Sequence, residues 1–275
     1  MKVSRVSDAL GAEVSGVELS RDLSAALVAE LREIWLEHLV LFFRDQDLPP
    51  ARFLAVARSF GEPMDYPFLE GLADFPQITT VAKLEHETVN FGGVWHSDTA
   101  YLAEPPGATL LIAREVPPRG GDTLFANQYL AYDSLPSGLK HELEGLDGVS
   151  TSAKADASRT REDRIHDSGR SGVAEEFHAV HPVVRRHPET ARKALYVNPA
   201  HTLRFDGMTE VESAPLLAAL FEHQVRPEFT CRFTWKPGSL ALWDNRCTLH
   251  FPVNDYQGHR RAMHRVTLKG DVPRR

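Results

Sequence analysis

The sequence predicts an α+β protein whose core is a β-sandwich or jelly roll with helices packed around it. The chain has 275 residues, of which 42% are hydrophobic and 25% charged, so it can bury a substantial core. Strand-like and helix-like segments alternate over the first 60 residues. From about residue 76 the pattern changes to short strands separated by turns with Gly and Pro, which is typical of sandwiches and jelly rolls. No linker or repeat interrupts the chain, so we expect one domain over residues 1–275.

Two helices and a buried strand are predicted in the N-terminal segment. Residues 24–38 form a helix with one apolar face, because their apolar side chains recur at helical spacing. This face carries Leu27, Leu31, Ile34, Trp35 and His38. The run LVLFF at 39–43 follows as a buried strand. Residues 49–59 predict a second helix, since two prolines suit its first turn and Gly61 lies just past its end.

The rest of the chain predicts mainly strands. Residues 108–113, 239–244 and 262–269 are strands, and the GlyGly pair at 120–121 marks a turn. Residues 229–235 alternate in polarity, so their odd-numbered side chains face the core. These side chains are Phe229, Cys231, Phe233 and Trp235.

One further helix is predicted near residue 209. Thr209 and Glu212 have the spacing of a capping box, in which each side chain satisfies a backbone N–H at the start of a helix. The helix would place Leu216, Leu217, Leu220 and Phe221 on the core. Pro215 leaves the first residue of this helix open.

Residues 150–176 predict a long mobile loop, because they contain few apolar residues and many charges. A loop of this length inside a compact domain is often functional. We expect it to be a lid that becomes ordered over the site when substrate binds, and a solvated surface insertion is the alternative.

Composition excludes several classes of protein. The net charge is −7, whereas nucleic-acid-binding proteins usually have a basic surplus, so no nucleic acid is expected as a partner. The longest dense apolar patch, residues 39–43, is far shorter than the roughly 20 residues of a membrane helix. The N-terminus has no apolar signal core, so we expect a cytoplasmic protein with no membrane partner. Cys231 and Cys247 are too few for a disulfide scaffold and are interpreted as reduced structural thiols.

A candidate metal site emerges from three residues. His96 and Asp98 are two residues apart near a strand end, so both side chains leave the same face. His250, which follows a strand and a turn, is the candidate third ligand. Two imidazoles and one carboxylate form a facial triad that leaves open positions on a six-coordinate Fe(II), as non-haem oxygenases require. Most of the other histidines lie in polar or helical settings and favour surface or structural roles.

Two arginines follow closely after His250. Arg261 and Arg265 share one face of the predicted strand at 262–269, together with Met263 and Thr267, whereas His264 lies on the opposite, packing face. Guanidinium groups inside a barrel are costly unless they meet anions, and their geometry suits bidentate binding of carboxylates. Two surface arginines on an edge strand are the alternative interpretation.

These features, taken in order, resemble the Fe(II)/2-oxoglutarate-dependent dioxygenases of the taurine dioxygenase (TauD/TfdA) family. The matching motifs are His96-x-Asp98, GlyGlyAspThr at 120–123, TrpAspAsnArg at 243–246, His250 and ArgArg-x-Met-His-Arg at 260–265. The segments GAEVSGVELS and LVLFFRDQ also resemble the N-terminal part of the family. The resemblance covers nearly the whole chain, and it implies a double-stranded β-helix (jelly-roll) core with flanking helices.

The resemblance also implies roles for particular residues. His96, Asp98 and His250 would hold Fe(II), and Arg261, helped by the Thr123 hydroxyl, would pair with the distal carboxylate of the cosubstrate 2-oxoglutarate. Arg265 would lie near the C1 carboxylate of this cosubstrate and bind an anionic group of the prime substrate. Trp243 would be a wall near the site. The reaction would consume O2 and 2-oxoglutarate, hydroxylate the substrate, and release succinate and CO2.

The substrate is expected to be a small anion. Tyr66 and Gly92 stand where taurine dioxygenase has polar substrate contacts, which argues against taurine itself. Side chains that could make the pocket apolar are Phe91, Val94, Tyr101 and Phe205. A sulfonate, a sulfate ester, or an aryloxy or alkyl carboxylate with an apolar body would fit, and hydroxylation next to a heteroatom would lead to C–S or C–O cleavage.

Other interpretations stay open at this level. The main alternative is a hydroxylase of the same fold that acts on an amino acid or a biosynthetic intermediate. A jelly-roll binding protein without catalysis and a zinc hydrolase fit less well, because neither explains both the triad and the paired arginines. Relatives commonly form homo-oligomers, so a dimer or tetramer is expected.

Overall fold

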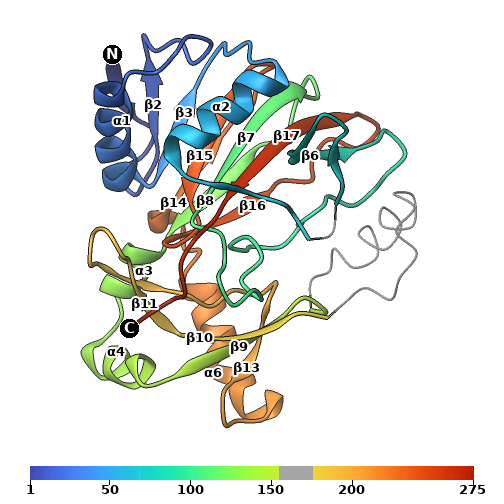
Figure 1. Cartoon of the computed structure of the whole chain (residues 1–275). Helices are drawn as coiled ribbons and strands as arrows, with labels where there is room; N and C mark the ends of the chain where they lie inside the picture. Colours follow the sequence, from blue (N-terminus) through green and yellow to red (C-terminus); the bar gives the residue numbers. More distant parts are fainter. Residues whose placement is uncertain (68, 155–175) are drawn as a thin grey trace.

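A large mixed sheet forms the frame of the molecule (Figure 1). The computed structural model describes residues 1–67, 69–154 and 176–275. Within this part of the chain, the strand order of the large sheet is β1-β2-β3-β15-β7-β17-β6-β5, and β4 pairs with β17. The strands are β1 (Lys2–Arg5), β2 (Ala12–Ser15), β3 (Val40–Phe43), β4 (Pro63–Met64), β5 (Gly71–Leu72), β6 (Phe75–Lys83), β7 (Ala108–Glu115), β15 (Leu240–Asp244) and β17 (Arg261–Leu268).

A smaller antiparallel sheet faces the large one. It has the order β14-β8-β16, with β14 (Thr230–Phe233), β8 (Thr123–Asn127) and β16 (Thr248–Pro252). Side chains alternate between the two faces of the large sheet. On β15, Leu240 and Leu242 point to the outer core, whereas Ala241 and Trp243 point to the inner core between the sheets. The facing sheets confirm the predicted jelly-roll core and the α+β class.

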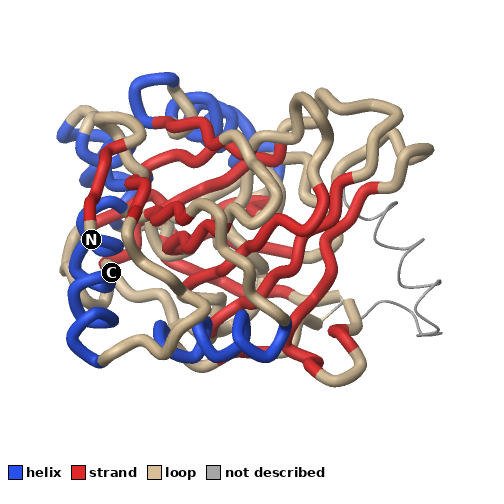
Figure 2. The backbone as a smooth tube through the Cα atoms, turned by 90° about the horizontal axis from the view of Figure 1, so that it is seen from above, coloured by secondary structure: helices blue, strands red, loops and turns tan. Residues whose placement is uncertain are grey.

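The outer face of the large sheet is covered by α1 (Ala25–His38) and α2 (Pro50–Phe60), as Figures 1 and 2 show. The Ser24 side chain accepts a hydrogen bond from the backbone N–H of Leu27 and begins α1. Proline occupies the first turn of α2, and Gly61 ends it. Both predicted helices and the buried strand between them are confirmed.

A third layer lies below the two sheets in Figure 1 and packs around its own apolar cluster. It contains a three-stranded sheet of order β10-β9-β13 and the hairpin β11-β12. The elements are α3 (Gln128–Asp133), α4 (Ser137–Glu144), β9 (Asp147–Thr151), β10 (His178–Pro182), β11 (Val184–Arg186), β12 (Lys193–Leu195), β13 (Thr202–Phe205), α6 (Glu210–His223) and the 3₁₀ helix η1 (Pro227–Phe229).

Two predicted segments differ from the structure. The predicted strand 229–235 is confirmed only over Thr230–Phe233, and Phe229 instead ends η1, where it packs in the third layer. Proline at the start of a short 3₁₀ turn favours this local structure over an extended strand. The predicted loop 150–176 begins too early, because β9 extends to Thr151. Residues 155–175, to which the lid hypothesis mainly refers, lie outside the described residues.

The cysteine prediction agrees with the structure, since Cys231 and Cys247 are both buried free thiols. Burial raises the pKa of Cys231 to about 12. In the described part of the chain, every helix is too short or too polar to cross a membrane.

The capping box at α6 gives a first testable prediction. Thr209 Oγ1 accepts from the backbone N–H of Glu212 at 3.2 Å, and Glu212 Oε2 accepts from the backbone N–H of Thr209 at 2.7 Å. Thr209→Ala is expected to lower the free energy of unfolding by about 1 kcal/mol, as measured in urea. Val211→Ala is the matched control, because Val211 is 84% exposed in the same turn. Equal stability of the two variants would contradict a stabilising cap.

Candidate active site

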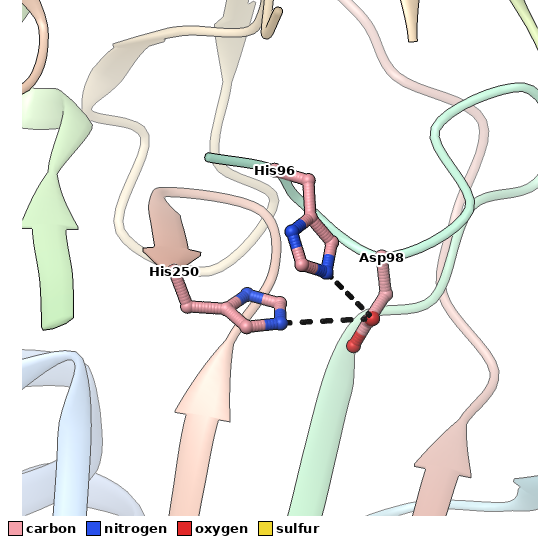
Figure 3. Close-up of side chains that lie close together, drawn as sticks. All are labelled: His96, Asp98 and His250. Carbon is pink, nitrogen blue, oxygen red and sulfur yellow. Dashed lines mark ion pairs between the residues drawn. The ribbon is translucent and has the colours of Figure 1, made fainter. Parts of the chain in front are cut away.

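The three candidate metal ligands lie close together (Figure 3). His250 belongs to β16, whereas His96 and Asp98 belong to the connection between β6 and β7. The backbones of the two histidines form an isolated β-bridge. His96 N–H donates to the His250 carbonyl at 3.0 Å, and His250 N–H donates to the His96 carbonyl at 2.8 Å. The connection is therefore fixed to the small sheet beside its third ligand.

The ligand atoms converge on one point. His96 Nε2 and His250 Nε2 lie 3.9 and 3.8 Å from Asp98 Oδ1. These separations are too long for hydrogen bonds. Two ligands with bonds of about 2.1 Å to one ion lie at most about 4.2 Å apart, a limit that both histidine–aspartate distances meet. Two imidazoles and one carboxylate are also the donor set of a facial triad, so the residues fit Fe(II).

Their protonation states favour a divalent cation. The His96 Nδ1–H donates to the Val94 carbonyl at 2.6 Å, which leaves Nε2 with its lone pair. Burial lowers the pKa of His96, and it lowers the pKa of His250 well below the ordinary value. Burial disfavours the charged form of Asp98, but the charge of Arg265 and the hydrogen bond from the Thr109 hydroxyl lower its pKa. Neutral imidazoles and an ionised carboxylate are the ligand forms that bind metal.

Arg261 and Arg265 lie on the inner face of β17, as predicted, and both are 5% exposed. The opposite face carries Val266 and Leu268, which pack under the helices. Within the described structure, Nε and Nη2 of both arginines are buried without a hydrogen-bond partner. Such donors are costly to bury unless an anion satisfies them. Each arginine therefore supplies a place for a carboxylate or a similar group.

Thr123 lines the same pocket as Arg261. The Trp235 indole N–H donates to Thr123 Oγ1 at 2.9 Å, and the guanidinium of Arg261 lies 5.7 Å from the Trp235 ring centroid. Because the hydroxyl oxygen already accepts, its own proton is available to an anion. The turn before it requires glycine: Gly121 has φ +71°, and a Cβ there would lie 3.2 Å from Arg261 Cδ.

Arg265 lies nearer the metal ligands. Its Nη1 is 3.7 Å from Asp98 Oδ1. Its guanidinium lies 4.1 Å from the centroid of the Tyr66 ring and 5.9 Å from that of Phe91. The two rings meet edge to face with centroids 6.4 Å apart. Tyr66 and Phe91 thus hold the charged group that we expect to meet the substrate.

One pocket joins these groups. It is lined by Val81, Phe91, His96, Leu111, Thr123, Trp243, His250, Pro252, Arg261 and Arg265. The Trp243 ring lies 4.7 Å from that of His250, which agrees with its expected place as a wall. Val94 is half-buried beside the pocket and contacts His96 through its carbonyl.

Phe205 does not reach this pocket. It is 1% exposed at the end of β13 and packs in the apolar cluster of the third layer. Its burial therefore reflects core packing, and we do not retain it as a pocket residue. The other aromatic candidate, Tyr101, is 3% exposed, and its ring lies 4.9 Å from that of His201, which in turn lies 6.2 Å from His96.

Gly92 is required by its closeness to a ligand. Its φ is +70°, and a Cβ at this position would lie 2.9 Å from Cε1 of His96. Any side chain here would demand that the imidazole move. Gly92 thus lets His96 pack directly on the backbone.

A second cluster of metal-ligating residue types is structural. His187 Nδ1 accepts from the backbone N–H groups of Glu189 and Thr190, so Nε2 carries the proton and donates to Asp244 Oδ2 at 3.0 Å. Asp244 also accepts two hydrogen bonds from the Arg246 side chain and one from its backbone N–H. Because the imidazole and the carboxylate are already satisfied, this cluster with Cys247 joins β15 to the third layer instead of holding an ion.

Two polar residues behind Asp98 were not predicted from the sequence. The Thr109 hydroxyl donates to Asp98 Oδ2 at 2.6 Å, and Asn245 Nδ2 donates to Thr109 Oγ1 at 2.8 Å. The available signals were a threonine inside the apolar run ATLLIA and an asparagine in the TrpAspAsnArg motif. The spacing of these residues does not show that they meet.

The fold and the site together define a class: a jelly-roll protein with a facial triad and paired arginines for anions. The family model "Taurine catabolism dioxygenase TauD, TfdA family" matches residues 2–267. The alpha-ketoglutarate-dependent sulfate ester dioxygenase of Pseudomonas putida is 34% identical over 280 residues, which cover 99% of this chain and 91% of that protein.

Solved structures of dioxygenases also resemble this chain. A taurine dioxygenase from Burkholderia xenovorans has a TM-score of 0.83 and 36% identity, covering 99% of this chain and 92% of that one. AAD-2, solved with Mn(II) and N-oxalylglycine, has a TM-score of 0.79 and 28% identity, covering 99% and 98%. The chain belongs to the TauD/TfdA family. It is an oxidoreductase that depends on Fe(II), 2-oxoglutarate (alpha-ketoglutarate) and O2.

Proposed function

We propose that this dioxygenase hydroxylates a small organic anion with an apolar body: a sulfonate, a sulfate ester, or an aryloxy or alkyl carboxylate. The observation that carries the proposal is the buried Arg265 guanidinium, which faces the pocket with two unsatisfied nitrogen atoms in the described structure. The reaction class belongs to the family, and succinate and CO2 are its co-products.

Each residue of the site has a proposed role. His96, Asp98 and His250 would hold Fe(II), and this ion would supply activation of O2 when it is bound. Arg261 and the Thr123 hydroxyl bind the distal carboxylate of the cosubstrate. Arg265 orients the anionic group of the prime substrate. The apolar walls then exclude water around the C–H bond that reacts.

The charges in the site favour an anionic substrate. Iron with Asp98 has one net positive charge, and the 2-oxoglutarate dianion with Arg261 has one net negative charge, so these four groups compensate one another. The charge of Arg265 is left over. No acidic side chain is among the described residues that line the pocket, and Asp98, which lies 3.7 Å from Arg265, is already counted with the iron. A buried cation needs a partner, and an anionic group of the substrate would provide it.

The remaining lining favours an apolar body. Val81, Phe91, Leu111, Trp243 and Pro252 contribute carbon surface around the two arginines. Small-molecule sites of this type combine apolar walls with a few polar groups that fix orientation. The match to a sulfate ester dioxygenase supports the same substrate chemistry.

The test measures O2 consumption and succinate formation with Fe(II), 2-oxoglutarate and a panel of sulfonates, sulfate esters, aryloxyalkanoates and amino acids. We expect stimulation by an anion with an apolar body. Arg265→Ala is expected to raise the KM for that anion by at least about 30-fold, since unpairing a buried charge costs about 2 kcal/mol or more.

A neutral alcohol with the same carbon skeleton is the control. Its KM should be nearly equal in the wild type and in Arg265→Ala, because it makes no ion pair. An unchanged KM for the anion in the variant, or stimulation by amino acids alone, would contradict the proposed substrate class.

Three further properties of the protein remain predictions from the sequence. They are a cytoplasmic location, a homo-oligomer (dimer or tetramer), and a single domain over residues 1–275. The family gives the reaction but none of these properties.

A further inference from the structure

We propose that Thr109 is a positioning residue that restricts Asp98 to one-oxygen coordination of the metal, so that three coordination positions stay open for 2-oxoglutarate and O2. This inference rests on the proposed roles of His96, Asp98 and His250. Its basis is a series of buried hydrogen bonds that runs from Trp243 to Asp98, and in each of them the donor and the acceptor are determined.

This series of hydrogen bonds begins with an indole N–H group, which can only donate. The Trp243 indole N–H donates to Asn245 Oδ1 at 2.9 Å. The backbone N–H of Asp98 donates to the same oxygen at 3.4 Å. With its oxygen occupied by two donors, the Asn245 side chain must turn its NH2 group toward Thr109, and Nδ2 donates to Thr109 Oγ1 at 2.8 Å. The orientation of the amide is therefore determined by its partners.

The chain ends on a group that can only accept. Because Thr109 Oγ1 accepts from Asn245, its proton is free for Asp98 Oδ2, which lies 2.6 Å away. An ionised carboxylate accepts through both oxygens but donates through neither. All four residues of the chain are at most 4% exposed, so water does not compete. Hydrogen bonds to a charged acceptor in such surroundings are among the stronger ones.

The two carboxylate oxygens of Asp98 thus have different neighbours. Oδ2 is held by Thr109, whereas Oδ1 faces the Nε2 atoms of both histidines at 3.8 and 3.9 Å. A carboxylate that used both oxygens would occupy four of six positions together with the histidines. With one oxygen, Asp98 and the two histidines would occupy three positions, which would leave three for the cosubstrate and O2.

The large sheet holds Thr109 rigidly. Thr109 pairs with Trp243 on one side and with Thr267 on the other, in the middle of the sheet. Asn245 is held as well, since its carbonyl accepts from the Ser97 hydroxyl at 2.8 Å. Trp243 and Thr109 thus lie on the paired strands β15 and β7, and the hydroxyl held there restricts rotation of the Asp98 carboxylate.

The experiment compares metal binding by Thr109→Val and Thr109→Ser with that of the wild type. Valine has nearly the shape of threonine but no hydroxyl, whereas serine keeps it. We expect Thr109→Val to raise the Kd for Mn(II) and Co(II) by about 10- to 100-fold, as loss of a partner behind a metal ligand typically does. Thr109→Ser should restore affinity close to that of the wild type.

A second readout reports coordination directly. The visible absorption of bound Co(II) depends on the number of ligands, so its bands should shift in Thr109→Val and return in Thr109→Ser. In the presence of Mn(II), the variant should also bind N-oxalylglycine, an inert 2-oxoglutarate analogue, more weakly, because a two-oxygen Asp98 occupies one of its positions.

Thr248→Val is the matched control for stability. Thr248 is 1% exposed and donates to the Asp244 carbonyl at 2.6 Å, so its hydroxyl has a structural partner and no contact with a ligand. It should lower the thermal midpoint without a change in the Co(II) spectrum. Thr109→Ala serves as the second hydroxyl-free variant if valine prevents folding.

The possible outcomes distinguish a failure of the inference about Thr109 from a failure of the proposed function. A wild type that binds neither Mn(II) nor Co(II) would contradict the proposed site. A wild type that binds them, with unchanged affinity, spectrum and N-oxalylglycine binding in folded Thr109→Val or Thr109→Ala, would overturn the role of Thr109 alone.

Discussion

His250→Ala is expected to lose 2-oxoglutarate turnover almost completely, together with stoichiometric binding of Mn(II). His250 supplies one of three convergent ligand atoms, and its ring is fixed between Trp243 and Phe125. Removing it leaves two ligands, which hold a divalent ion far more weakly, so metal affinity should fall by more than about 100-fold, beyond the loss typical of an outer partner. Equilibrium dialysis with Mn(II) measures this directly.

His178→Ala is the control for that variant. His178 is an exposed histidine on β10 that pairs with Glu176, so its removal should leave metal binding and turnover unchanged. Excess Fe(II) should not restore the activity of His250→Ala. Full turnover by His250→Ala would show that another residue completes the metal site.

Arg261→Leu is expected to raise the KM for the cosubstrate 2-oxoglutarate by about 30-fold or more, because a buried carboxylate without its charged partner costs about 2–5 kcal/mol. The effect should be selective. The Arg261 variant should change the KM for the cosubstrate, whereas Arg265→Ala should chiefly change that for the prime substrate. Steady-state kinetics with each component varied in turn measures the split.

Arg261→Lys refines this test. Lysine keeps the charge but lacks the planar pair of donors, so it should recover only part of the affinity. If the two arginine variants raised the KM for both components equally, the assignment of one arginine to each anion would be wrong.

The residues that alternate along strands were the most predictable part of the molecule. On β17 the two arginines face the pocket and Val266 and Leu268 face the helices, because a strand presents its side chains to two sides in turn. The helices at 25–38 and 210–223 were also predictable, since their caps and apolar spacing are local. The candidate metal ligands were identified in the sequence because their order along the chain resembles that of a family, and the structure brings them together.

Contacts between distant segments could not be predicted. Thr109 and Asn245 meet behind Asp98 only because β7 and β15 are neighbours in the sheet, and this pairing is set by the whole fold. Phe205 shows the complementary difficulty. The sequence does not distinguish an apolar residue that lines a pocket from one that fills a core. The place of Phe205 in the third layer therefore became clear only from the structure.

The β-bridge between His96 and His250 has a consequence for how the enzyme acquires its metal. Two of the three ligands are held together by backbone hydrogen bonds rather than by the ion. Little conformational entropy must then be lost on metal binding, because the polypeptide has already been ordered by folding. We therefore expect this centre to bind a divalent ion without refolding of the backbone that carries His96 and His250.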